Sequence, residues 1–312
     1  MLTLCLDTYD GQQCVLPMLL EWSLTHTGSV PCDSMAVTCL YREELGSILP
    51  KASHFTALWE GNVMLRGVVD AYEISFSRQG LVATVEGRGM AALLLDNEAE
   101  ALSYGRASLS EIVANHVLPC GIRCEIGRDD VLDGYSVPAG VSQWRAVRDF
   151  LLRQRGYEPY FTREGVLVCA PLWGSGRTIT LGDDAPVLEL KKREQRYGVI
   201  SEVVVRDKVQ GISQRVVNED FTARDGQRRQ ILYMPRSTAG ERRYTGQYQI
   251  AQSKLEALEI EVTLPLPFAA FPGDRVVLNI ERLGPEATYE VVRSRSFMNE
   301  NGQLTELVLS VR

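Results

Sequence analysis

Residues 68–86 read VVDAYEISFSRQGLVATVE, and this stretch predicts a β-hairpin. Between residues 72 and 77 the side chains alternate, so that Tyr72, Ile74 and Phe76 fall on one face of a strand and polar residues fall on the other. Gly80 supplies the turn, and residues 81–86 continue as the second strand. We expect one face of this hairpin to pack on a core and the other to contact water.

A similar arrangement returns near the C-terminus. In the first half 11 positions separate residue 69, the end of a Val-Val pair, from Gly80, and in the second half 10 positions separate residue 292, the end of another Val-Val pair, from Gly302. A strand follows each glycine. Self-similar spacing is the sequence signature of a repeat, so we interpret the two ends of the chain as duplicated units of related topology.

Strand-like alternation extends outward from both hairpins. Residues 1–95 alternate between turn signals at the intervals of an antiparallel barrel or sandwich, and a short helix over 90–96 is expected to close this unit. From residue 178 the strand signal returns and runs almost to the end. One helix, about 248–258, is expected to interrupt it.

The segment 108–172 has a different character and predicts a small α/β insert. Ser108 and Glu111 have the spacing of a capping box, which marks a helix start. A second helix is expected to begin near Ser142 and to stop at Gly156, and a short hairpin follows it.

The composition is that of an ordinary folded protein. The length of 312 residues predicts roughly two domains, and 45% hydrophobic with 23% charged residues indicates neither disorder nor a fibrous repeat. Seven cysteines with irregular spacing are expected to be mostly reduced and buried. The N-terminus has no basic signal-like region and no apolar run approaches the roughly 20 residues of a membrane span. We therefore expect a soluble chain made and kept in the cytoplasm, without membrane insertion.

Charge argues against a nucleic-acid-binding surface. The net charge of −7 disfavours counterion-release binding to phosphates and suits a surface that DNA must slide past. The basic groups Lys191-Lys192-Arg193, Arg196 and Arg228-Arg229 are interspersed with Glu189, Glu194, Asp220 and Asp225. A mixed, solvated surface is the first interpretation of this patch and a protein contact the second.

Candidate nucleotide and metal sites are weak. The glycines of Gly87-Arg88-Gly89 match neither nucleotide-binding spacing and are better explained by a strand-to-helix junction. His116, Cys120 and Cys124 recur every four residues, but Pro119 and Gly121 would break the helix that could align them, and a fourth metal ligand is not evident.

Hydrolase chemistry also lacks a convincing acid and base. The three histidines are His26, His54 and His116, and the acidic pairs are Asp129-Asp130, Asp183-Asp184 and Glu219-Asp220, which we expect to be solvated in polar loops. We therefore assign no catalytic, cofactor-binding or metal-binding residue and expect no cofactor.

Taken in order, several motifs resemble the baseplate hub family of contractile phage tails, the late-control-protein type of prophages and tail-derived bacteriocins. The resemblance spans nearly all 312 residues. One departure is Gly89, where many relatives carry Asp. The motifs are Trp22 with Pro31 and Asp33, Gly67-Val68-Val69, residues 85–94 (VEGRGMAALL), Glu111-Ile112-Val113, Gly121-Ile122, Ser142-Gln143-Trp144, Gly156-Tyr157, Gly198-Val199-Ile200-Ser201, Phe268, Pro272-Gly273-Asp274 and Gly302-Gln303-Leu304-Thr305.

This resemblance implies a mainly β fold with an α+β insert, in which two tail-tube-like antiparallel β-barrels flank a small α/β domain. The expected divisions are 1–105 for the first barrel with its closing helix, 106–175 for the insert, and 176–312 for the second barrel with its helix. It also implies a homotrimer, because three chains with two similar barrels each would present six quasi-equivalent units to a sixfold tube.

The function implied by the resemblance is structural and not enzymatic. The trimeric ring would join the tail tube protein to the spike protein and contact a LysM-type tail protein and baseplate wedge proteins. DNA would be only passing cargo, inside an acidic or neutral lumen. The location would be the baseplate of a virion or tail-like bacteriocin, assembled in the bacterial cytoplasm.

Two alternatives remain open. A tail-associated cell-wall hydrolase of hub-like fold would carry a catalytic domain after the hub, and we expect no room for one because the last strand ends at Val311. A nucleic-acid-binding barrel would need aromatic stacking and basic grooves, which the acidic balance disfavours.

Overall fold

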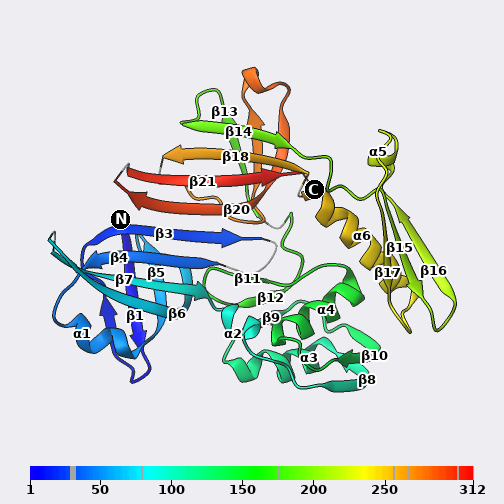
Figure 1. Ribbon diagram of the computed structural model, residues 1–312, viewed down its shortest axis with the longest axis horizontal. Helices are drawn as coiled ribbons and strands as arrows, with labels where there is room; N and C mark the ends of the chain where they lie inside the picture. The colour runs from blue at the N-terminus through cyan, green and yellow to red at the C-terminus, as the bar shows by residue number, and fades with distance from the viewer. Residues whose placement is uncertain are drawn as a thin grey trace.

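The computed structural model describes residues 1–28, 33–78, 80–174, 176–255, 257–265, 268–300 and 302–311. The chain is mainly β, with one large sheet, three small sheets and six α-helices in these ranges (Figure 1). Pro31 and Cys32 lie outside the described residues, and the six cysteines within them are free thiols. Within the described ranges, no helix has both the length and the apolar character needed to cross a membrane.

The N-terminal part forms one half of the large sheet and packs around Leu4, Leu6 and Phe55, which are fully buried. The alternation inferred from the sequence is present, since Leu24, Val37 and Val85 all face this core. The elements are β1 (Leu2–Thr8), β2 (Gln13–Val15), β3 (Leu19–Thr27), β4 (Ser34–Leu40), α1 (Leu45–Ile48), η1 (Leu49–Lys51), β5 (Ala52–Trp59), β6 (Asn62–Ser77), β7 (Gly80–Gly89) and α2 (Ala92–Leu95).

The middle part has its own core and is the expected α/β insert in its content of elements. Its helices start and stop where capping chemistry places them: the Ser108 hydroxyl accepts a hydrogen bond from the Glu111 N–H, the Ser142 hydroxyl accepts one from Arg145, and Gly156 adopts φ +75° at a C-cap. The elements are β8 (Leu102–Ser108), α3 (Leu109–His116), η2 (Leu118–Cys120), β9 (Cys124–Ile126), β10 (Val131–Val137), α4 (Gln143–Arg155), β11 (Tyr160–Phe161) and β12 (Leu167–Cys169).

The C-terminal part divides between two sheets, which the sequence did not indicate. Strands β15, β16 and β17 form a separate sheet on which α6 packs, with Val203, Val205 and Ile250 in its core. The other strands complete the large sheet. The elements are β13 (Thr178–Gly182), β14 (Glu189–Glu194), β15 (Glu202–Asp207), β16 (Ile212–Val217), α5 (Glu219–Thr222), β17 (Arg229–Tyr233), α6 (Ala239–Leu255), β18 (Leu258–Pro265), β19 (Arg275–Asn279), η3 (Glu281–Leu283), β20 (Ala287–Asn299) and β21 (Gly302–Ser310).

Helix α6 begins well before the expected position near residue 248. A capping box sets its start, because the Thr238 hydroxyl accepts from the Glu241 N–H at 3.2 Å and the Glu241 carboxylate accepts from the Thr238 N–H. The same carboxylate pairs with Arg153 of α4 at 2.6 Å, so the helix is tied to the insert. The Thr238-to-Glu241 spacing was the sequence signal for this start.

The large sheet joins both ends of the chain. Its strands follow the order β14-β18-β21-β20-β3-β4-β7-β6-β5-β1-β2, and β19 continues from β20 to β13. The join is made by β20, which pairs antiparallel with β3 over residues 293–298 (Figure 1).

The predicted repeat is present in the strand order. The run β3-β4-β7-β6-β5-β1 in the first half matches β14-β18-β21-β20-β19-β13 in the second, and the matched strands also follow one another along the chain in the same order. One direction differs, since β13 runs parallel to β19 whereas β1 runs antiparallel to β5.

The two halves match in the structure with an offset of one residue from the match that the two Val-Val pairs gave in the sequence. In β6 the pairing shifts around Asp70, and in β20 it shifts around Val292, so each bulge lies ten residues before its hairpin glycine (70 to 80, and 292 to 302). Both glycines have a positive φ that favours glycine, +127° at Gly80 and +112° at Gly302. Asp70 is therefore equivalent to Val292, and the matching valine pairs in the sequence are offset by one.

Phe55 explains the glycines of the first hairpin. A Cβ on Gly87 would lie 2.4 Å from the Val68 carbonyl oxygen and 2.7 Å from the Phe55 ring. A Cβ on Gly67 would lie 2.8 Å from the same ring. The two glycines thus make room for a fully buried aromatic side chain at the centre of the N-terminal core.

We expect the substitution Gly87→Ala to lower the free energy of unfolding of the chain by about 1–3 kcal/mol, because overpacking a filled core forces backbone shifts. Urea unfolding followed by circular dichroism measures this. The matched control is Gly105→Ala, since Gly105 is exposed in β8 and its Cβ position is open. Equal stabilities for the two variants would contradict the packing role of Gly87.

Candidate functional site

The seam between the two halves of the sheet is the first candidate site. Backbone pairing joins Arg293 to Thr27 at one end and Met298 to Trp22 at the other. Side chains of β20 that face the core are covered here: Ser294 is 1% exposed and Ser296 is 5% exposed. The seam therefore behaves as the interior of one sheet and not as a contact between loosely docked domains.

A loop from the C-terminal half reinforces the seam. The Asp274 carboxylate accepts hydrogen bonds from the backbone N–H groups of Arg177 and Phe271, at 2.8 and 3.0 Å. This fixes Phe271 in a T-shaped contact with the His26 ring, 5.1 Å between centroids, and beneath the Arg163 guanidinium, 4.4 Å from the ring centroid. The insert and both halves of the sheet thus meet around one aromatic side chain.

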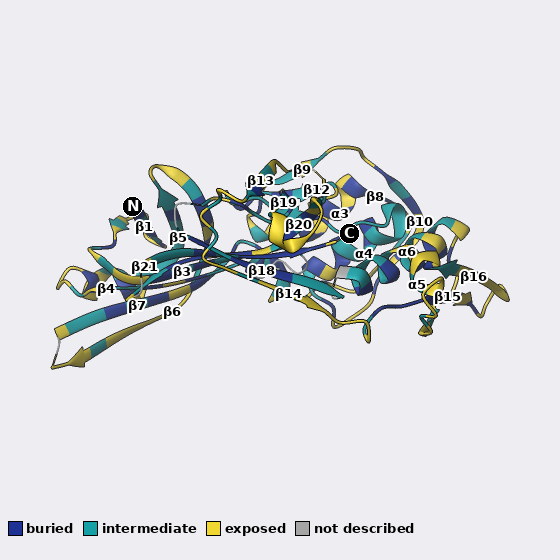
Figure 2. Cartoon of the chain, turned by 90° about the horizontal axis from the view of Figure 1, so that it is seen from above, coloured by how far each residue is buried: buried dark blue, intermediate teal, exposed yellow. Residues whose placement is uncertain are grey.

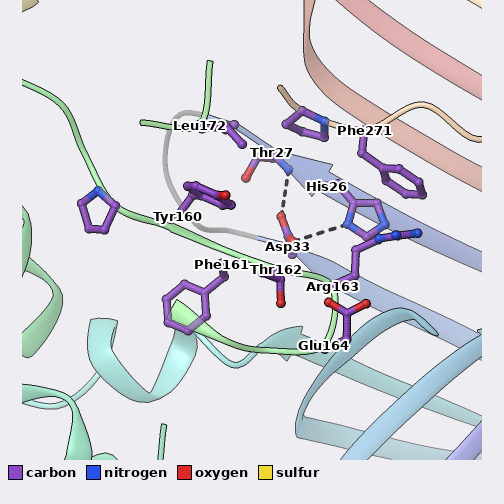
Figure 3. A pocket seen from close by; sticks show the side chains of 13 residues that line it. His26, Thr27, Asp33, Tyr160, Phe161, Thr162, Arg163, Glu164, Leu172 and Phe271 are labelled. Carbon is purple, nitrogen blue, oxygen red and sulfur yellow. Dashed lines mark hydrogen bonds and ion pairs between the residues drawn. The ribbon is translucent and has the colours of Figure 1, made fainter. Parts of the chain in front are cut away.

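A pocket of about 310 Å³ opens beside this junction (Figure 3). Asp33 organises one wall, because its carboxylate accepts from the Thr27 N–H at 2.8 Å and lies 3.4 Å from His26 Nδ1. His26 is only 3% exposed, and its Nε2 atom is buried without a hydrogen-bond partner among the described residues. Nucleophilic catalysis would need a hydroxyl or thiol within hydrogen-bond reach of this imidazole, and none of the described hydrogen bonds supplies one.

Two strand edges form the second candidate site. Residues 71–76 of β6 pair only with β7, and β14 pairs only with β18, in the part of the chain that the structure describes. On β6, Tyr72 is 43% exposed, Ile74 is 42% exposed and Phe76 is 84% exposed. Figure 2 shows the outer parts of β6 and β7 projecting from the body with exposed residues. Unpaired N–H and C=O groups make such edges templates for another strand.

The basic patch inferred from the sequence lies largely on β14. Lys191, Lys192 and Arg193 are exposed there, and Lys191 pairs with Glu189 at 3.0 Å. The other basic pair lies elsewhere: Arg228 binds the backbone carbonyl of Gly198, and Arg229 pairs with Glu202 at 3.1 Å. The patch is thus not one basic surface, and its strand portion is a sheet edge.

One face of the sheet across the seam carries mixed charge with more acidic than basic groups. Direct cross-strand pairing shows that these side chains share the face opposite the cores, for example along the row from Glu189 through Thr263 and Glu306 to Arg295. The charged residues that strand pairing places on this polar face are Asp7, Glu21, Glu73, Glu86, Glu189, Glu259, Glu261, Glu290 and Glu306, with Arg66, Arg88, Lys191, Arg193, Arg275, Arg293 and Arg295.

The glycine triplet is part of the sheet. Its arginine, Arg88, binds the carboxylates of Asp70 at 2.7 Å and Asp96 at 2.6 Å, which ties the β6 bulge to the end of α2. Close packing requires a glycine at position 87, where a Cβ would lie 2.4 Å from the Val68 carbonyl oxygen, whereas a Cβ on Gly89 would lie 3.2 Å from Asp33, a tight contact that a small shift relieves. The triplet ends β7 shortly before α2, so it lies next to the expected strand-to-helix junction, but Gly87 is explained by packing inside the sheet.

The His and Cys residues weighed as metal ligands are not brought together. His116 is 1% exposed, and its two ring nitrogens contact Gln143 Oε1 at 2.7 Å and the Tyr104 hydroxyl at 3.2 Å. The Cys124 thiol instead lies 3.7 Å from Cys169, and this contact together with burial raises the pKa of the Cys169 thiol. Across the described ranges, three or more potential ligands do not gather at any point.

Of the three acidic pairs, Asp129-Asp130 departs from the solvated loop expected for it, because Asp130 is buried, whereas Asp183-Asp184 and Glu219-Asp220 are exposed as expected. Asp129 accepts from the backbone and hydroxyl of Ser110, both at 2.8 Å, whereas Asp130 is 6% exposed and binds Arg155. The two carboxylates therefore have separate structural partners. The Arg155 guanidinium lowers the pKa of Asp130, so this ion pair stabilises the insert when Asp130 is ionised.

We expect Asp130→Asn to lower the free energy of unfolding at pH 7 by about 1–3 kcal/mol, the range for a hydrogen bond to a charged group. A lowered folded-state pKa stabilises above the unfolded pKa of about 3.9, and this stabilisation is lost as pH falls through the folded value. The difference in free energy of unfolding between the parent chain and the variant should therefore disappear at acid pH. The control is Asp133→Asn, an exposed position on β10; a pH-independent gap at position 130 would exclude the ionic explanation.

Comparison with known proteins identifies the fold. No family model and no curated protein matches the chain. A tail protein from Neisseria meningitidis MC58 matches with a TM-score of 0.76, 15% identity, and coverage of 99% of this chain and 96% of the other. The prophage MuSo2 43 kDa tail protein from Shewanella oneidensis matches with a TM-score of 0.77, 16% identity, and coverage of 100% and 98%.

A third match links the fold to secretion systems. It is an Escherichia coli component of the type VI secretion system, described as similar in structure to the T4 bacteriophage tail proteins gp27 and gp5, with a TM-score of 0.53, 12% identity, and coverage of 94% and 73%. The chain therefore has the fold of phage-type tail proteins, and the resemblance inferred from the sequence motifs is confirmed at the level of fold.

Proposed function

We propose that this chain is the structural baseplate hub of a contractile phage-type tail or tail-like bacteriocin. The observation that carries the proposal is the duplicated strand order, with both copies joined in one sheet and, among the described residues, one open edge on β14 and another along residues 71–76 of β6. The likeness in fold to tail proteins over essentially the whole chain supports it. The role is structural and not enzymatic.

In the proposed particle, three copies form a ring of six quasi-equivalent units. Each half of the large sheet, with its own core, corresponds to one tail-tube-like β-barrel, and the insert lies between the two in the chain. The proposed divisions are 1–105, 106–175 and 176–312. Heterologous interfaces that close after three chains would let a sixfold tube meet a threefold spike.

The proposed partners are the tail tube protein above the ring, the spike protein below it, a LysM-type tail protein and baseplate wedge proteins. The chain would be located in the virion or tail-like particle after assembly in the bacterial cytoplasm. The polar face of the sheet would line the lumen, through which DNA passes as cargo. Its excess of carboxylates suits passage, because a basic wall would hold DNA by counterion release.

Stoichiometry tests the ring. We expect native mass spectrometry of assembled tail tips to find three copies of this chain for each tip, because duplication supplies six units from three chains. The isolated chain can remain monomeric without the tube or spike. Six copies for each tip would contradict the proposal.

Charge reversal tests the lumen. We expect Glu21→Lys combined with Glu86→Lys to slow genome ejection while tail assembly stays intact, because both side chains are exposed on the polar face and neither lies directly opposite a charged residue. The effect should be larger at low salt, because counterion-release binding weakens as salt rises. The control is Glu43→Lys combined with Glu44→Lys, the same charge change at exposed positions beside α1 and away from the polar face. Ejection rates equal to those of the parent in a DNA-carrying particle would exclude this face as the lumen wall.

A further inference from the structure

The repeat shows which strand segment of the second half is equivalent to the open edge of β6. Aligning the hairpin glycines Gly80 and Gly302, and with them the two bulges, places residues 71–76 on residues 293–298. In β20 that segment is the one that pairs with β3 at the seam. The open edge of β6 thus corresponds, residue for residue, to the edge of β20 that pairs with β3.

The edge strand β14 corresponds in the same way to β3. Leu190 pairs with Val262 of β18, and Trp22 pairs with Val37 of β4. Val262 in turn pairs with Leu307, and Val37 pairs with Val85. Leu307 and Val85 are equivalent, because each lies five residues after its hairpin glycine (302 to 307, and 80 to 85). Leu190 is therefore the equivalent of Trp22.

We propose that residues 71–76 of β6 pair antiparallel with β14 of a second copy of this chain, in the register that β20 and β3 use at the seam. This inference rests on the proposed ring and defines its subunit joint. Because Met298 pairs with Trp22, Phe76 lies opposite Leu190. The pairs that follow along the strands are Ile74 with Lys192, Glu73 with Arg193, and Tyr72 with Glu194.

Burial at the seam supports the joint. Ser294 and Ser296 of β20 are 1% and 5% exposed because β3 and its neighbours cover them. Their equivalents Tyr72 and Ile74 are larger and apolar, yet more than 40% exposed in the single chain. A second copy would remove this apolar surface from water, which is the main driving force for association.

The side chains of the two edges are complementary in the proposed register. On the polar face the Glu73 carboxylate meets the Arg193 guanidinium, and opposite charges directly across a strand pair are favourable. On the core face Phe76 meets Leu190, and Ile74 meets the aliphatic stem of Lys192. Pairing with β18 and β7 fixes which face each of these side chains occupies. A slip by one residue would therefore place Phe76 and Ile74 opposite side chains of the polar face and would separate Glu73 from Arg193.

Disulfide trapping in assembled tail particles tests the register. The double variant Phe76→Cys/Leu190→Cys should form a covalent ladder of chains that ends at three, because residues directly opposite across strands have Cβ atoms close enough for a disulfide. Phe76→Cys/Leu188→Cys and Phe76→Cys/Lys192→Cys are the matched controls, each displaced by two residues. The parent chain, with its natural cysteines, gives the background.

The outcomes separate the two proposals. Stronger cross-linking by the 76/190 pair than by both controls supports the joint. Stronger cross-linking by the 188 or 192 variant overturns the register but leaves the ring intact. Particles that contain three copies and cross-link at none of these positions overturn the joint alone, whereas particles without a ring of three overturn the proposed function and the joint together.

Charge exchange gives a second test that does not introduce cysteines. Glu73→Lys should reduce incorporation of the chain into tail particles, and Arg193→Glu in the same chain should restore it, because the two changes reverse one cross-strand pair. Glu86→Lys is the control, since Glu86 is exposed on the same polar face but lies on β7, inside the sheet. Failure of the second substitution to rescue the first would overturn the pairing of Glu73 with Arg193.

Discussion

The backbone ladder between β20 and β3 is the interaction on which the rest of the structure depends. It converts two units that are far apart in sequence into one sheet, with residues 293–298 and Trp22–Thr27 in antiparallel register. Beside the ladder, Phe271 packs on His26 of β3 and contacts Arg163 of the insert. Because the ladder uses main-chain groups, it places few demands on sequence, and this agrees with solved structures of similar fold at about 15% identity.

Features governed by local chemistry could be predicted from the sequence. Ser108, Ser142 and Gly156 mark helix ends through hydrogen bonds within a few residues, and all three are confirmed. The alternation around Ile74 reported correctly that Tyr72, Ile74 and Phe76 share one face. The expectation that this face packs on a core is wrong in the single chain, because all three side chains are exposed there. Each of these signals lies within one turn or one strand.

Features set by distant pairing could not be predicted in the same way. The Val-Val pairs suggested the repeat but missed its register by one residue, because a bulge at Asp70 or Val292 leaves no local mark in the sequence. The separate sheet of β15–β17 was missed because its strands have the same alternation as those of the large sheet. Asp130 was expected to be solvated, but its burial depends on Arg155, which lies on a helix distant in sequence.

The separate sheet also has a consequence for symmetry. β3 and β4 are joined through residues 28–33, whereas their equivalents β14 and β18 are joined through residues 195–257, which include β15–β17 and α6. In the proposed ring, every second hairpin would therefore carry an added domain and the hairpins between would carry none. The rim would alternate around the axis, so a wall with nearly sixfold backbone geometry would present threefold features to its neighbours at that rim.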